Sequence, residues 1–256
     1  MPATEPPLGL RLRAWLPFVA SAALAAATLR LSWDYPWVAV LAASAVALTV
    51  WRRRRAKQRV RDMAQAGQTA ELLDAWQDAM ADVPHAETLM PLIHATAFTS
   101  AGQTERARAA LDRAEQGPAW QSTREHRLIV ETLLDAFEGQ RDRALDKSAE
   151  LVALPLPPVG PVTADRVVEL RAAVAAAARA FAHRSIRDDV ALLRAAARKN
   201  PLIHWPLRYA TAIALIDQGR GAEVSALLSG APKWPEDSAF SAFQRELLDY
   251  ARSTAP

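Results

Sequence analysis

A helical pattern marked by regularly spaced glycines recurs along most of the chain, and it restricts the fold more than any other feature. From about residue 60 the apolar residues follow a helical period, with Gly or Pro between segments and no convincing strand alternation. Similar segments align on Gly67, Gly102, Gly139 and Gly219, and a further copy aligns with Arg184 at the glycine position. The spacings of 35, 37, 45 and 35 residues predict a repeat with one insertion, against the alternative of an unrelated helical bundle.

The residues around these glycines resemble the tetratricopeptide repeat (TPR), a helix–turn–helix unit of about 34 residues. The resemblance covers roughly residues 60–232 and is clearest in the copy that contains Ala95, Phe98, Gly102, Ala107, Leu111 and Ala114. Pro91 and His94 stand where the family has Trp and Leu. The resemblance implies an all-α fold in which TPR-like pairs of helices stack into an α-solenoid.

A proline-rich interruption divides the expected repeats into two parts. The interruption is expected at residues 155–162; the stretch LPLPPVGP at 154–161 contains four prolines and cannot continue a helix, because proline lacks the backbone N–H. Repeats are therefore expected over residues 62–154 and again over 163–252, with Thr163 as the cap of the first helix of the second part.

Two apolar runs precede the repeats and predict a transmembrane helical hairpin over residues 14–51, after an N-terminal tail at 1–13. Each run has sixteen residues without a charge, and the flanks extend the expected spans to about 12–33 and 36–52. Residues 52–61 predict a basic juxtamembrane helix. The expected membrane-interface residues are Trp15, Trp33, Tyr35, Trp37, Trp51, Arg52, Arg53, Arg54 and Arg55.

The arginines set the expected topology of this hairpin. Arg11, Arg13 and the run after residue 51 lie at its two ends, whereas the loop carries Arg30 alone, which predicts that both ends face the cytoplasm. The expected localisation is an integral membrane protein, in a bacterial inner membrane given the many Arg and Ala and few Lys, with membrane lipid as a partner. Two alternatives are a pair of buried helices in a soluble domain and a cleaved signal peptide in the first run.

Charge and cysteine content exclude several classes of function. The net charge of +3 divides into +8 for residues 1–61 and −5 for residues 62–256, so the body lacks the basic face of a nucleic-acid-binding domain. There is no Cys, which excludes disulfides and thiolate metal sites. The five histidines form no helical metal pair, and no nucleotide-binding or catalytic motif occurs, so we expect no metal, no cofactor, no catalytic residue and no enzyme.

A groove lined by the first helix of each repeat is where the TPR resemblance places a protein or peptide partner. It implies a partner-binding groove of Leu92, Thr96, Thr99, His126, Ile129, Leu133, Arg171, Val174, Tyr209 and Ile213. This mixture of apolar and polar groups suits a peptide or a partner helix. The expected function is a membrane-anchored scaffold or adaptor; the alternatives are a structural or assembly subunit of a membrane complex and, less favoured, an enzyme with an unrecognised site.

Overall fold

The computed structural model describes residues 30, 35–80, 83–158 and 160–253. Within these ranges the chain is helical and has no strand, which confirms the all-α class. The chain divides into two compact units, residues 1–58 and 59–256, and each is described by itself. Helix α2 (Pro36–Gln65) belongs to both, because the division falls within it.

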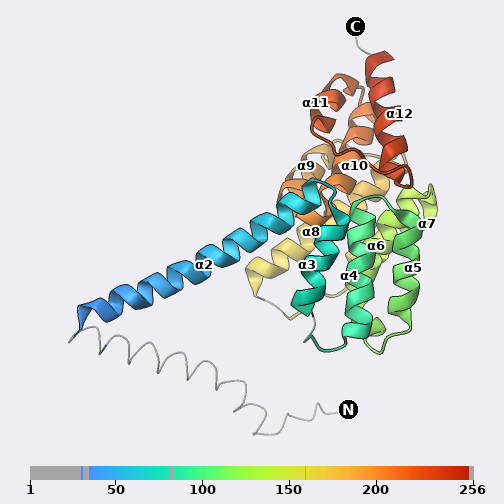
Figure 1. The fold of residues 1–256 in the computed structure, drawn as a ribbon. Coiled ribbons are helices and arrows are strands. Elements are labelled where there is room, and N and C mark those ends of the chain that lie inside the picture. The colour runs from blue at the N-terminus through green and yellow to red at the C-terminus, as the bar shows by residue number, and fades with distance from the viewer. Residues whose placement is uncertain (1–29, 31–34, 81–82, 159, 254–256) are drawn as a thin grey trace. The chain divides into compact units, whose positions relative to one another are not determined.

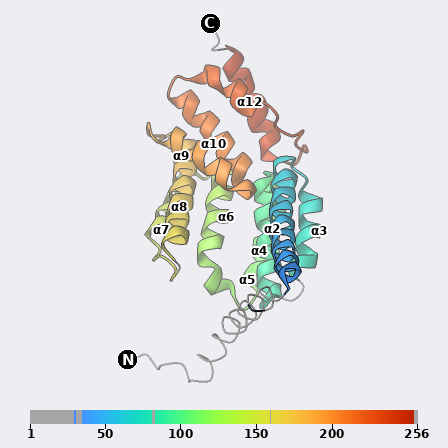
Figure 2. The same ribbon diagram turned by 90° about the vertical axis from the view of Figure 1, so that its left-hand side faces the viewer.

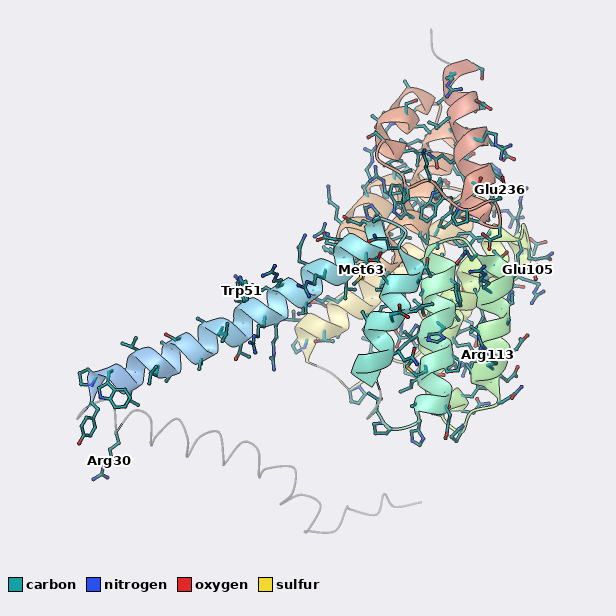
Figure 3. The ribbon with its side chains drawn as sticks, in the orientation of Figure 1. Arg30, Trp51, Met63, Glu105, Arg113 and Glu236 are labelled. Carbon is teal, nitrogen blue, oxygen red and sulfur yellow. The ribbon has the colours of Figure 1, made fainter. Side chains whose placement is uncertain are left out.

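The part of α2 in the first unit is largely exposed and consists of an uncharged, mostly apolar run at residues 36–51 followed by basic residues. Tyr35, Trp37 and Trp51 are more than half exposed, and Arg52–Arg55 are exposed as well, with the Arg55 guanidinium 5.1 Å from the centre of the Trp51 ring. Trp51 lies about halfway along α2 (Figure 3). Trp15 and Trp33, the other two expected interface aromatics, lie outside the described residues.

The predicted membrane-spanning hairpin is not supported, and the localisation derived from it is wrong. Over the described part of the chain, α2 included, no helix combines the length and the apolar character that crossing a bilayer requires. The apolar run of α2 covers sixteen residues, or about 24 Å of helix, whereas a bilayer core is about 30 Å thick. Four arginines follow that run directly. Except for Arg30, the other expected span, residues 12–33, lies outside the described residues.

The second unit consists of helices connected mostly by short turns. Consecutive helices pack in pairs, α4 with α5, α6 with α7, and α9 with α10, while α8 contacts α6, α7, α9 and α10. Figure 1 shows α4 and α5 side by side, and Figure 2 shows α6 between α4 and α8. The helices are α3 (Thr69–Met80), α4 (Ala86–Ser100), α5 (Thr104–Glu115), α6 (Arg124–Phe137), α7 (Arg141–Ala153), α8 (Pro161–Phe181), α9 (Asp189–Lys199), α10 (His204–Asp217), α11 (Val224–Leu228) and α12 (Ala239–Ser253), with 3-10 turns η1 (Trp120–Thr123), η2 (Pro201–Ile203) and η3 (Gly221–Glu223).

The repeated glycines all occupy left-handed turns at helix ends. Gly67, Gly102, Gly139 and Gly219 have φ between 68° and 75°, a conformation that favours glycine. After each one, the next residue donates its backbone N–H to the carbonyl five positions back, as in a Schellman cap. In the remaining copy His183 takes this position, with φ 55°, and Arg184 donates the hydrogen bond. The expected alignment on Arg184 is therefore one residue out of register.

The proline-rich interruption ends two residues earlier than the sequence indicated. Leu154–Pro158 carry no helix, and α8 begins at Pro161 with Gly160 as its N-cap. Proline is favoured at the first helical position because its φ is already helical and its missing N–H has no partner there. Thr163 therefore lies inside the first turn of α8 and is not its cap.

The C-terminal segment closes the core against a distant turn. Phe240 is fully buried and stacks on Tyr209, with the ring centres 4.7 Å apart, and the Trp234 Nε1–H donates to the Tyr209 hydroxyl at 2.7 Å. Ser238 Oγ donates to the Ala101 carbonyl at 2.6 Å, next to the α4–α5 turn. Residues 234–240 thus tie the last helix to the first complete pair of helices.

Candidate binding cavity

A cavity of about 570 Å³ opens between α4, α6, α8 and η2, all in the second unit. Its wall is mainly apolar, and its polar groups come from α4, η1, the start of α6 and the residue before η2. We call it the apolar cavity; its lining is Thr96, Ser122, Thr123, Glu125, His126, Ile129, Val167, Leu170, Asn200, Pro201, Leu202 and Ile203. Its volume lies within the range of pockets that hold small ligands and peptide side chains.

The polar wall is built on a hydrogen-bonded pair from α4 and α6. Thr96 Oγ1 lies 2.9 Å from the Leu92 carbonyl and 2.7 Å from His126 Nε2. Because the single hydroxyl hydrogen goes to the carbonyl, Thr96 Oγ1 accepts the second bond, and the network assigns the imidazole hydrogen to Nε2. His126 Nδ1 is then left as an acceptor. Burial lowers the pKa of His126 against the opposing effect of Glu125, so the ring is neutral near pH 7.

Glu125, beside His126, is fixed by a buried arginine. Arg171 is only 4 % exposed, and its Nε donates to Glu125 Oε1 at 3.0 Å. Its two other nitrogens donate to the carbonyls of Leu154 and Pro155, where α7 ends. The Arg171 guanidinium therefore neutralises Glu125 and joins α6, α8 and the proline-rich interruption, so that one carboxylate oxygen of Glu125 stays held in place.

The hydroxyls of the lining are already engaged. Ser122 Oγ donates to the Ala119 carbonyl at 2.7 Å, and Thr123 Oγ1 donates to the Trp120 carbonyl at 2.9 Å. Among the residues that the structure describes, no group of three or more His, Asp or Glu side chains is arranged to hold a metal ion. The polar groups that α6 contributes to this wall, His126 Nδ1 and the carboxylate of Glu125, are hydrogen-bond acceptors, so they favour a ligand that presents donors.

Three of the residues expected in the groove line this cavity, and the others lie in the core. Thr96, His126 and Ile129 line it. The remaining seven are buried, which leaves little of their surface for a partner: Leu92, Thr99, Leu133, Arg171, Val174, Tyr209 and Ile213. The TPR resemblance that selected them points to one face of the first helix in each repeat, but in this unit most of that face packs against neighbouring helices.

The sequence reasoning missed most of the apolar wall. Val167 and Leu170 lie at helical spacing with Val174, Ala178 and Phe181 on α8, a pattern in the sequence that indicates a buried helix face but not a cavity. Pro201–Ile203 enter the lining because they form a 3-10 turn between α9 and α10. A periodic pattern cannot indicate such a turn, and the only local signal is Pro201 itself.

Comparison with known proteins identifies no relative. No family model matches the chain, and neither a curated protein nor a solved structure matches it.

Proposed function

We propose that the second unit is a set of TPR-like helix pairs and acts as a protein-binding module that holds an apolar peptide segment of a partner in the apolar cavity. The observation that carries the proposal is the lining itself, an apolar wall from α8 and η2 facing hydrogen-bond acceptors from α6. Recurrent left-handed turns after α2, α4, α6, α8 and α10 support the repeat, since each joins a helix to the next element in the same way.

The charge state of the cavity favours a neutral ligand. Arg171 compensates the Glu125 carboxylate, and His126 is uncharged because burial lowers its pKa. A buried charged ligand group would lack a full counter-charge there, which is costly. Backbone N–H groups of a peptide satisfy His126 Nδ1 and Glu125, while its apolar side chains contact Ile129, Val167 and Leu202.

Methyl NMR on the whole chain tests this proposal with a capped hexapeptide of Leu, Ile and Ala as probe and a capped hexapeptide of Ser and Gly as control. Ile129 and Ile203 line the cavity, whereas Ile186 is 56 % exposed outside it and serves as an internal reference. The apolar peptide is expected to shift the Ile129 and Ile203 methyl signals and not that of Ile186. Equal shifts at all three, or none with either peptide, would contradict the proposal.

A pair of tryptophan substitutions on α8 provides the matched control. Val167→Trp places a large ring in the cavity, whereas Val168→Trp adds the same ring at a position that is half exposed and outside the lining. We expect the first variant to weaken the apolar peptide by about tenfold or more and the second to leave its affinity unchanged. Circular dichroism checks that both variants fold; a folded Val167→Trp variant with wild-type affinity would place the ligand elsewhere.

A further inference from the structure

A second cavity in the same unit has a different chemical character. It encloses about 200 Å³ between α9, α10 and α11, and three arginines and a histidine contribute to its lining with no acidic side chain among them. We call it the arginine cavity; its lining is Arg194, Ala197, Arg198, His204, Arg208, Thr211 and Leu227.

Two of the three guanidinium groups have no carboxylate partner among the described residues. Arg194 pairs with Glu223 at 2.7 Å, but no acidic group in the described part of the chain lies within ion-pair distance of Arg198 or Arg208. Arg208 Nε is shielded from solvent and makes no hydrogen bond. A partly buried cation with an unused donor is a costly arrangement, and an anion in the cavity would compensate it.

The neighbours of Arg208 hold its side chain in place without neutralising it. The guanidinium lies over the Trp205 ring, 4.9 Å from its centre. His204 Nδ1 is 2.9 Å from the Ala197 carbonyl, which assigns the ring hydrogen to Nδ1 and leaves Nε2 as an acceptor 3.4 Å from Arg208. The neutral imidazole therefore supports the guanidinium but supplies no negative charge.

We propose that the arginine cavity binds a phosphate-type oxyanion, held by Arg208 and Arg198 with Arg194 at its edge. Guanidinium groups present planar pairs of donors that match the oxygens of phosphate, and the stacked, desolvated Arg208 needs little reorganisation to make such bonds. The anion is either free phosphate or the phosphate group of a phosphorylated side chain, since both offer the same oxygens. This site is separate from the apolar cavity, shares no lining residue with it, and does not depend on the proposed peptide binding.

Isothermal titration of the full chain with sodium phosphate, at an ionic strength held constant with sodium chloride, tests the site. Arg208→Gln is the diagnostic variant, and Arg245→Gln is its matched control, because Arg245 is exposed on α12 and outside the lining, while both changes remove one positive charge. Arg208→Gln is expected to weaken phosphate by about tenfold or more, Arg198→Gln by a smaller factor, and Arg245→Gln not at all.

Thermal unfolding separates binding from a folding defect. Phosphate is expected to raise the melting temperature of the wild type above that in chloride of equal ionic strength, and to do so much less in a folded Arg208→Gln variant. O-phosphoserine amide serves as the second probe: tighter binding than inorganic phosphate assigns the site to a phosphorylated partner, and equal or weaker binding assigns it to the free anion. Absence of phosphate binding to the wild type, or equal weakening in the Arg208→Gln and Arg245→Gln variants, would overturn the proposal.

Discussion

Replacing Gly102 by Ala tests how the turn after α4 is joined to the C-terminal segment. Gly102 has φ 70°, and a Cβ atom there would lie 2.8 Å from both Phe240 Cγ and Ser238 Oγ. Ala at this position is thus strained in its backbone and also collides with a fully buried ring. Gly139 is the matched control, since it has φ 75° but nothing within 4 Å of the position of an added Cβ.

The two substitutions are expected to differ by the cost of the collision. The left-handed conformation costs a non-glycine residue about 1–2 kcal/mol, so Gly139→Ala should lower the free energy of unfolding by about that amount. Overpacking of a filled core adds about 1–3 kcal/mol for Gly102→Ala. The Ser238 hydrogen bond to the Ala101 carbonyl and the Ala239 N–H bond to the Gly102 carbonyl both lie next to the clash, which places the expected loss toward the upper end.

Urea unfolding followed by circular dichroism measures both losses, provided that the slope of free energy against urea stays the same in the variants. The free energy of unfolding is expected to be highest for the wild type, lower for Gly139→Ala and lowest for Gly102→Ala, with about 1–3 kcal/mol between the two variants. If the two variants lose equal stability, the C-terminal segment does not pack on the α4–α5 turn in solution. If Gly139→Ala is the less stable one, the reasoning from close approach is wrong.

Two further predictions concern buried ionisable groups. Asp135→Ala should lower the free energy of unfolding by about 2–3 kcal/mol, because the fully buried carboxylate pairs with Arg108 and Lys147. The loss is moderated because both cations keep a second acidic partner, Glu138 for Arg108 and Glu131 for Lys147. Urea unfolding measures this loss. The second prediction concerns pH. Burial lowers the pKa of His126 and His204 in the folded state, so the unfolded state takes up protons at a higher pH than the folded state does. The free energy of unfolding should therefore be largest above about pH 6.5 and fall as the pH drops below that value. Urea midpoints at pH 7.5 and 5.5 measure the fall, which His126→Gln should reduce; a midpoint unchanged in the wild type would exclude this linkage.

The left-handed turns at the helix ends were predictable because their signals are local. A glycine at a helix end, followed by a polar residue and the start of the next helix, indicates a left-handed turn, and the turns at Gly102 and Gly139 have this conformation. The copy without a glycine was misplaced by one residue, because spacing alone positions a turn less accurately than residue type. His183 takes the left-handed conformation there, and its Nδ1 lies 2.8 Å from Asp217 Oδ1 at the end of α10, a long-range contact that the sequence does not display.

The predicted membrane span in α2 is not supported, although α2 itself has 30 residues. The apolar run of α2 has the residue types and the flanking arginines of a span, but its sixteen residues are too few to cross a bilayer core.

The packing of residues 234–240 against the α4–α5 turn was not predictable for a different reason. Ser238 and Ala101 are 137 residues apart in the chain, and no periodic pattern relates them.

Arg171 shows why the candidate site could be predicted only in part. The TPR resemblance placed it on the expected groove. The end of α7 and the prolines after it leave carbonyl groups without a helical donor, and the Arg171 guanidinium donates to those of Leu154 and Pro155. The Nε–H of Arg171 then donates to Glu125 Oε1 and holds this carboxylate beside His126. The proline-rich interruption therefore helps, through Arg171, to fix the position of the Glu125 carboxylate in the cavity wall. That dependence joins three segments far apart in the chain, and helical periodicity describes each segment only by itself.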